Sequence, residues 1–597
     1  MSERSPAPMW LRLPLALVVL GYAGLTLVLM VTLGFREPFA DQWRQTVPLL
    51  EGSLPGSVFQ LESGHRQVLP NLVRLLDLHL AGGGGGLLAW SGVLLYATAL
   101  AVLLRVLLRD RGAGALQRWT AHAVVALGCG FLGQARMLMH PNESVQVAGV
   151  YLGLTVTLAC LAAPATRARL AVALLACTAA TFSFGTGFAT FVAAGLLLVL
   201  RAASFRHLAA AVASGVFVLV AYRFLLPSGE AIGANVHLAP LQLAADLPRW
   251  LAAPFVQAFF GLGDPQFQNG IGAAVAAHAP HGGVWVDLAT WCSVPLGPVA
   301  TRNAAAAGLG AAGIVWLAIA SRSAVRAARS GTATAAAGLA LAWFAVAVGG
   351  LVCVARTGYF EDHGDQRFAE RFLVWSVLFW VGLALWLLDR WRGPRSGPAA
   401  AIGVCATALL LWPVQRAWIS WTVATRNQTE RTALALRLGV DDPAAAPSPE
   451  DLNGLPFARC VQPVQRRRLQ MFAEPAMPAL GAQLAWSGPP PTDELPSLAP
   501  PHRLVLPDGR AFAHESLSLP SVLLGEPGQE WPIVDAAGVV VGRLRADEAS
   551  ALWRRLPDPL VSRRGNLYVR ADAGGAPGFV VGATAPHRAL AIVPAPR

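Results

Sequence analysis

Lysine is missing from this chain of 597 residues, so all 46 basic side chains are arginine. Charge of either sign is scarce, because charged residues make up 13% of the chain while 55% of the residues are hydrophobic. Soluble domains are about one quarter charged, so this composition excludes an ordinary soluble protein and predicts an integral membrane protein. The abundant Ala, Gly and Pro fit a GC-rich coding sequence, which explains the missing lysine better than selection for phosphate-binding guanidinium forks.

Cysteine pairs and nucleotide-binding motifs are missing too. The seven cysteines are scattered without a Cys-x-x-Cys pair, so neither a disulfide framework nor a zinc site is predicted. The glycine run at 82–86 lacks the Lys-Ser or Lys-Thr of a phosphate cradle and is interpreted as a loop. The net charge of +12 resides in short arginine clusters between apolar runs, which is typical of membrane topology, so no nucleic-acid partner is predicted.

Long apolar runs dominate residues 1–415. They cover 11–33, 84–108, 119–133, 145–164, 169–200, 208–226, 291–320, 332–354, 372–389 and 399–414. The run at 169–200 is too long for one crossing, and Ser-Phe-Gly-Thr-Gly at 183–187 predicts a hairpin of two short helices or a helix broken at depth. Counting it twice gives about eleven spans, so the predicted fold class is mainly α, a polytopic membrane domain.

The arginines predict an orientation. Short basic connections follow the runs that end near 108, 164, 200, 320 and 389. If 169–200 crosses twice, all of them fall on the side of the N-terminus, which the positive-inside rule makes cytoplasmic. The chain is then a multi-pass membrane protein with a cytoplasmic N-terminus and an uncleaved first helix, and its bilayer lipid is a partner.

Residues 416–597 lack the long apolar runs of the preceding part. Residues 416–500 are predicted as a helical and Pro-rich linker, and 501–597 as a small extracytoplasmic mixed-β domain. Within that domain, 547–556 is predicted as a helix and 589–593 as one of the strands.

The first outer loop holds two groups of candidate residues. Asp41, just beyond the first span, is a candidate general base or metal ligand, and the alternative is an N-cap of the helix that Gln42 begins. Glu62, His65 and Arg66 follow. If their segment is helical, Glu62 and Arg66 share a face and could bind a diphosphate, whereas the alternative is a solvated ion pair before an interfacial helix at 68–80.

Two later outer loops hold the remaining candidates. Arg136, His140 and Glu143 form a charged cluster between two spans, where such residues are costly unless paired or solvated; the alternative is a snorkelling Arg136 and an ordinary helix start. Arg356, Arg367 and Arg371 lie in the loop at 356–371, which also carries acids. Arg367 and Arg371, four apart on the lip of a helix, suit phosphate binding, and the alternative is a hydrated turn.

This layout resembles the C-type glycosyltransferase superfold, whose polytopic enzymes use polyprenyl-phosphate-linked sugars. Members place an acidic residue after the first helix, as Asp41 is here, and often a second in the next outer loop, where Glu143 corresponds. More narrowly, the chain resembles a group of bacterial membrane proteins with a Glu-x-x-His-Arg segment, here Glu62 to Arg66, and a late Arg-Tyr segment, here Arg371-Phe372. The similarity covers about residues 10–415 and leaves out the C-terminal part.

The resemblance implies a membrane glycosyltransferase that moves a sugar from a polyprenyl-phosphate donor to an extracytoplasmic acceptor, which is a cell-envelope glycan, lipid or protein. Asp41 and Glu143 are then the catalytic residues, and the substrate-binding residues are Glu62, His65, Arg66, Arg136, His140, Arg356, Arg367 and Arg371. The acidic pair common after the first helix is absent because Gln42 follows Asp41, so no cofactor is assigned and a divalent metal ion stays an open alternative. A transporter and a non-enzymatic scaffold or sensor are the competing classes.

Overall fold

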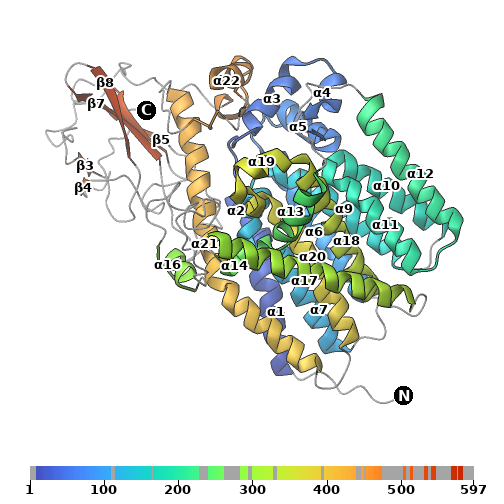
Figure 1. Cartoon of the computed structure of the whole chain (residues 1–597). Helices are drawn as coiled ribbons and strands as arrows, with labels where there is room; N and C mark the ends of the chain where they lie inside the picture. Colours follow the sequence, from blue (N-terminus) through green and yellow to red (C-terminus); the bar gives the residue numbers. More distant parts are fainter. Residues whose placement is uncertain are drawn as a thin grey trace. The chain divides into compact units, whose positions relative to one another are not determined.

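The computed structural model describes most of the first 473 residues and six strands after them. The described residues are 9–62, 64–108, 114–163, 166–226, 239–260, 283–292, 299–326, 332–391, 396–438, 446–449, 452, 454–473 and the strands between 502 and 582. Figure 1 labels most of their helices and strands. The chain divides into two compact units. Unit 1 comprises 1–34, 52–76 and 86–421, and unit 2 comprises 35–51, 77–85 and 422–597.

Unit 1 is helical and rich in apolar helices. Nine helical segments within the described residues are long and apolar enough to cross a bilayer: Met9–Leu33, Gly86–Leu108, Ala115–Met139, Pro141–Leu161, Phe205–Leu225, Val299–Arg326, Ala333–Ala355, Glu370–Arg390 and Ser396–Glu430. The first is built of α1 (Met9–Val19), the π-turn η1 (Leu20–Gly24) and α2 (Leu25–Leu33). The predicted mainly α membrane protein is confirmed, while the count of about eleven spans stays a prediction.

The long run at 169–200 is broken where the glycines predicted a break. α10 (Arg167–Ser183) ends at Phe184, whose backbone is extended (φ −160°, ψ 143°), and the 3₁₀ turn η3 (Gly185–Phe188) leads into α11 (Ala189–Leu200). A Cβ on Gly187 would lie 2.1 Å from the carbonyl oxygen of Ala180, so only glycine lets the chain turn back this closely. α12 (Phe205–Val220) and the π-turn η4 (Ala221–Leu225) follow.

A second break interrupts the span at 115–139. α7 (Ala115–Cys129) stops before the turn η2 (Leu132–Gln134) and α8 (Ala135–Met139). Side chains replace the lost helical hydrogen bonds: Gln415 Nε2 and Thr26 Oγ1 donate to the Gly130 carbonyl at 2.9 Å each, and Gln415 Oε1 accepts from Leu132 N–H at 2.8 Å. Such partners are required because a bilayer core offers no water to a freed backbone group.

The centre of unit 1 is formed by α9 (Pro141–Leu161), α18 (Ala333–Ala355) and α20 (Glu370–Arg390). α6 (Gly86–Leu108) and α10 pack on α9, and α18 packs on α20. A Cβ on Gly338 would lie 2.6 Å from the Gly382 carbonyl oxygen, so α18 and α20 meet through two glycines.

Two helices too short to span, α13 (Pro240–Leu251) and α14 (Ala253–Phe259), pack against α17 (Val299–Arg326), α18 and α20. Trp250 is completely buried, and most of α14 is buried in protein. The described part of the short apolar segment at 251–262 is therefore enclosed by other helices. α16 (Gly283–Cys292), α19 (Thr357–Asp362) and the 3₁₀ turn η5 (Gly364–Phe368) complete the connections of this part, and α4 (Gly56–Phe59) precedes the first hairpin.

Unit 2 is organised around a small apolar core. α3 (Gln42–Glu51) packs on α22 (Phe457–Arg466), and Trp43 meets the Phe457 ring edge-on at 5.1 Å. Trp43, Ala433, Leu452, Cys460, Val461 and Met471 form the buried cluster. The turn η6 (Gln470–Phe472) closes it, and Gln470 N–H donates to the Gly82 carbonyl at 2.7 Å.

Two helices contribute residues to both units. α5 (Val68–Leu80) confirms the predicted helix at 68–80, and α21 (Ser396–Leu438) continues as one helix into the predicted helical and Pro-rich linker at 416–500. Farther on, the described strands are β3 (His502–Val505), β4 (Ala511–His514), β5 (Glu530–Val534), β6 (Val540–Arg545), β7 (Asn566–Ala573) and β8 (Ala576–Gly582). β3 pairs with β4, and the other four form an antiparallel sheet in the order β5-β6-β7-β8. The predicted helix at 547–556 and strand at 589–593 lie outside the described residues.

Candidate functional site

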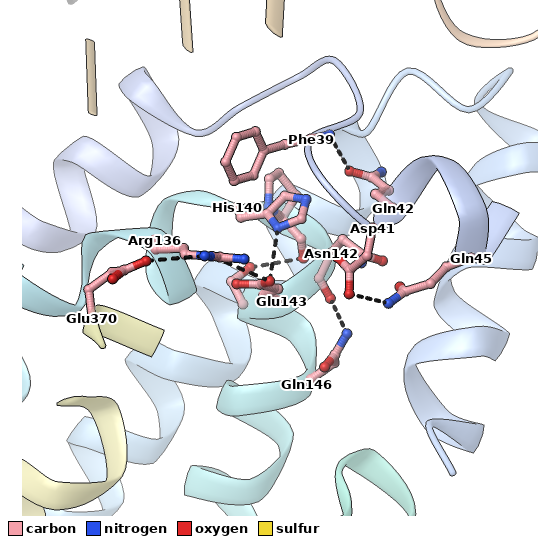
Figure 2. A network of polar contacts seen from close by, with 12 residues as sticks. Phe39, Asp41, Gln42, Gln45, Arg136, His140, Asn142, Glu143, Gln146 and Glu370 are labelled. Atoms are coloured by element: carbon pink, nitrogen blue, oxygen red, sulfur yellow. Dashed lines mark hydrogen bonds and ion pairs between the residues drawn. The ribbon is translucent and has the colours of Figure 1, made fainter. Parts of the chain in front are cut away.

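Glu143 lies in the first turn of α9 and is held by two cationic or polar neighbours. His140 Nδ1 is 3.6 Å and Arg136 Nε is 4.0 Å from Glu143 Oε1 (Figure 2). Arg136 Nη1 also binds Glu370 Oε1 at 3.1 Å, so the arginine lies between two carboxylates from different helices. The sequence cluster of Arg136, His140 and Glu143 is thus brought together by the structure.

One oxygen of the Glu143 carboxylate is left over. The residue is 9% exposed, and its Oε2 is buried with no hydrogen-bond partner in the described part of the chain. Because an unpaired buried oxygen is unfavourable, such an atom is expected to meet a ligand or water. Glu143 therefore has one oxygen fixed by the protein and one available for chemistry.

Nearby backbone and amide groups fix the start of α9. Pro141 occupies the first helical turn, where its missing N–H costs nothing. Arg74 from α5 donates from Nε to Asn142 Oδ1 and from Nη1 to Asn71 Oδ1, both at 2.5 Å, and Gln146 Nε2 donates to the Asn142 carbonyl at 3.1 Å. The residue that precedes Glu143 is thus held rigidly.

Arg356 and Arg371 form a pair of like charges. Arg356 follows α18 and lies over the Tyr359 ring at 5.6 Å, while Arg371 at the start of α20 lies over the Phe372 ring at 5.2 Å. Arg371 Nη2 donates to Gln366 Oε1 at 2.8 Å, and within the described residues neither guanidinium has a carboxylate within ion-pair distance. Burial and then the charge of Arg371 lower the pKa of Arg356.

Glu370, the residue before Arg371, binds Arg136, which lies 4.0 Å from Glu143, so the start of α20 and the start of α9 contribute to one polar site of unit 1. An anion bound by the two arginines would relieve their mutual repulsion and replace the missing carboxylates. The two arginines therefore suit a phosphate group, and the Glu143 carboxylate suits a proton acceptor.

The segment from Glu62 to Arg66 is a β-hairpin. The predicted helix that would make Glu62 and Arg66 neighbours on one face is therefore wrong. β1 (Leu61–Glu62) pairs with β2 (His65–Arg66), which places Glu62 opposite His65 and Arg66 opposite Leu61. Gly64 has a φ of +79°, a conformation that favours a tight turn over a helix.

Arg66 is occupied by backbone carbonyls. Its Nε binds Tyr222 O at 2.5 Å, its Nη1 binds Phe59 O at 2.6 Å and its Nη2 binds Leu226 O at 3.1 Å. These bonds tie the hairpin to η4, and burial lowers the pKa of Arg66. A role for Arg66 in substrate binding stays a prediction.

His65 is stacked on Phe184 of the helix break, with ring centroids 3.9 Å apart. Burial and then the positive charge of Arg356 lower the pKa of His65 to about 4, so the imidazole is neutral at neutral pH. The stacking thereby links the first loop to the α10–α11 break.

Arg367 and Arg371 do not lie one turn apart on one helix, which corrects the predicted arrangement. Arg367 belongs to the turn η5, whereas Arg371 belongs to α20. Arg367 Nε binds Asp246 Oδ1 of α13 at 2.6 Å, and the neighbouring Asp365 binds Arg302 Nη2 of α17 at 2.6 Å. The turn is therefore clamped by two ion pairs.

The sequence analysis did not predict that Asp246, Arg302 and Asp365 take part in buried ion pairs around η5. Arg302 lies inside the apolar run at 291–320, where a charged residue is unusual and implies a buried partner. That signal could have found Arg302, but nothing in the spacing indicates that its partner is Asp365.

Asp41 directly precedes α3 and belongs to unit 2, whereas the other predicted site residues belong to unit 1. Asp41 Oδ2 accepts a hydrogen bond from Gln45 Nε2 at 3.1 Å (Figure 2). It also lies 3.9 Å from Arg44 Nη2. Phe39 N–H donates to Gln42 Oε1 at 3.4 Å, which closes the turn before the helix. Asp41 therefore lies at a helix start, while its alternative role as an N-cap stays a prediction.

Metal ligation has no built cluster in the described ranges. No three His, Cys, Asp or Glu side chains converge there, so we derive no step through a metal ion. Comparison of the chain with protein-family models, with curated proteins and with solved structures finds no match. The resemblance to C-type glycosyltransferases therefore rests on the sequence motifs.

Proposed function

We propose that the chain is a membrane glycosyltransferase that moves a sugar from a polyprenyl-phosphate donor to an acceptor hydroxyl outside the cytoplasm. The observation that carries the proposal is the buried Glu143 Oε2 without a hydrogen-bond partner, in a carboxylate that Arg136 and His140 hold by its other oxygen; Arg356 and Arg371, which have no carboxylate partners among the described residues, add two cationic groups. The proposed location is a bacterial cytoplasmic membrane with the N-terminus inside, as the arginine distribution predicts.

The chemistry divides between these groups. Arg356 and Arg371 bind the lipid phosphate and stabilise the negative charge that it gains when its bond to the sugar breaks. Glu143 accepts the proton of the acceptor hydroxyl as the acceptor oxygen bonds to the sugar carbon. Arg136 and His140 hold the other carboxylate oxygen, so the proton acceptor is fixed before the donor arrives.

Asp41 is the second candidate for the base, on its position after the first span. Both carboxylates are therefore tested, with Glu361 as the matched control because it is an exposed acid on α19. The wild type, Glu143→Gln, Asp41→Asn and Glu361→Gln would be purified in nanodiscs and given polyprenyl-phosphate sugars and acceptor glycans.

Release of polyprenyl phosphate and thermal protection by the donor would both be measured. We expect release by the wild type and Glu361→Gln, and loss of at least about a hundredfold, a typical general-base contribution, in Glu143→Gln with protection kept. Loss in Asp41→Asn alone would assign the base to Asp41. Neither release nor protection by the wild type would contradict the transferase and favour a transporter or scaffold.

A further inference from the structure

The break between α10 and α11 carries a hydroxyl that differs from its neighbours. Four hydroxyls around it donate to backbone carbonyls of their own segment: Thr178, Thr181, Ser183 and Thr190. Thr186, in the turn itself, is 4% exposed, yet its Oγ1 has no hydrogen-bond partner among the described residues. A helical hydroxyl satisfies itself locally, so the break leaves Thr186 without a partner.

A second unpartnered atom lies beside this turn. His65 Nδ1 is buried and has no hydrogen bond within the described chain, although the ring stacks on Phe184. A Cβ on Gly185 would lie 2.6 Å from that nitrogen and 3.0 Å from Tyr222 Oη, so glycine is needed for the imidazole to sit against the turn. Gly185 joins Phe184, which stacks on the imidazole, to Thr186, so the two unpartnered groups belong to this turn and to the ring that packs against it.

The missing partner has a recognisable chemistry. His65 is neutral, and a threonine hydroxyl both donates and accepts, so the two atoms call for hydroxyl groups rather than for a charged group. Arg356, whose charge acts on His65, adds an anion-binding group to this part of unit 1. Hydroxyls beside an anion are the features of a sugar attached to phosphate.

We propose that the α10–α11 break and His65 form a carbohydrate subsite, in which Thr186 Oγ1 and His65 Nδ1 bind sugar hydroxyls. The expected occupant is the sugar of the lipid-linked donor, which rests on the proposed function, and a glycan acceptor offers the same hydroxyls. Phe184 and Gly185 position the imidazole. Arg356, with Arg371, binds the phosphate side of the ligand.

The test compares lipids with and without a sugar. The full chain in nanodiscs would be titrated with a polyprenyl-phosphate sugar, with plain polyprenyl phosphate and with free oligosaccharide. Thr186→Val keeps the shape and removes the hydroxyl, and Thr190→Val is its matched control because that hydroxyl already binds the Gly187 carbonyl. Gly185→Ala would displace the imidazole, and Gly195→Ala is its control because a Cβ there meets open space.

We expect Thr186→Val to weaken binding of the sugar-bearing lipid about tenfold, a usual effect of losing one hydrogen bond to a ligand, with plain polyprenyl phosphate unaffected. Its unfolding temperature should not fall, because no protein hydrogen bond is lost, whereas that of Thr190→Val should fall without a change in the ratio of affinities. Gly185→Ala should reduce the ratio of the affinity for the sugar-bearing lipid to the affinity for plain polyprenyl phosphate, and Gly195→Ala should leave that ratio unchanged.

The outcomes separate this subsite from the transferase. If Thr186→Val weakens only the free oligosaccharide, the subsite holds the acceptor. If the wild type binds the sugar-bearing lipid and discriminates through Thr186 but transfers nothing, the proposed function fails and the subsite stands. An affinity ratio that Thr186→Val leaves unchanged for every sugar would mean that the hydroxyl meets only water, and would overturn the subsite.

Discussion

Arg367 Nε lies 2.6 Å from Asp246 Oδ1, and both side chains are buried between η5 and α13. Asp246 also accepts from Gln242 Nε2 at 2.9 Å and lies 3.6 Å from Arg249, so one carboxylate organises the end of α13. Because Arg356 and Arg371 flank the loop that contains η5, this ion pair fixes the part of the chain between the two arginines.

Asp246→Asn should destabilise unit 1 by about 3 kcal/mol, because it leaves the Arg367 guanidinium buried without its counter-charge. Thermal unfolding in detergent would measure the change. Arg249→Gln removes a partly exposed partner of the same aspartate, so its effect should stay below about 1 kcal/mol. Equal losses of stability in both variants would show that the buried Asp246–Arg367 pair contributes no more than the partly exposed Asp246–Arg249 pair.

Arg371→Gln should raise the KM for the lipid-linked donor about 10- to 100-fold, since a hydrogen bond to a charged group contributes about 1.5–3 kcal/mol. Folding should not suffer, because the substitution relieves repulsion of Arg356 and breaks no ion pair with a carboxylate. Donor titrations at two salt concentrations would test this. Arg223→Gln, at an exposed arginine of η4, is the control, and an equal rise there would argue against a specific phosphate contact.

Stability should depend on pH through His65. Its pKa is lowered to about 4 in the folded protein, whereas an unfolded histidine titrates near 6.5. The unfolded chain therefore binds more protons between these values, so stability falls as the pH drops from about 6.5 to about 4 and levels off below. Loss of about 3 kcal/mol is the upper bound for this group.

His65→Gln should remove that part of the pH dependence, which unfolding temperatures between pH 4 and 7 would show. His207→Gln is the control, since His207 lies at an exposed helix start and bonds Ser204 Oγ at 2.9 Å. An unchanged pH profile in His65→Gln would mean that the imidazole is not shielded as the structure shows.

Gly310→Ala should destabilise the contact between α17 and α13 by about 1–3 kcal/mol, the usual cost of overpacking. A Cβ there would lie 1.9 Å from the Pro248 carbonyl oxygen, so α13 has to move. Gly308→Ala on the same helix meets open space and should leave the unfolding temperature unchanged or slightly higher. Equal unfolding temperatures of the two variants would show that α17 and α13 do not approach each other this closely at Gly310.

The lengths of the apolar runs and the positions of the glycines were enough to predict most of the helices. The break at 183–187 and the helix at 68–80 follow from local patterns, because a glycine-rich interruption and helical spacing act over a few residues. The hairpin at 61–66 was missed because the two-residue strands are too short to show a period, and only Gly64 marks the turn.

The candidate site was predictable in its residue types but not in its pairings. Arg136, His140 and Glu143 are close in sequence, so their contact follows from one loop and one helix start. Asp246 with Arg367 and Arg302 with Asp365 join distant segments, and charge alone does not say which partner an arginine meets. Long-range packing decides that choice.

The break after α7 imposes an order on biogenesis. The Leu132 N–H binds Gln415, which lies on α21, the last of the candidate spans in the described chain. The ribosome delivers that glutamine after every earlier span has been made, and until then Leu132 lacks this partner in an apolar bilayer. Assembly of the membrane domain is therefore completed by its last helix, and a nascent chain that stops before Gln415 should remain a substrate for quality-control proteases.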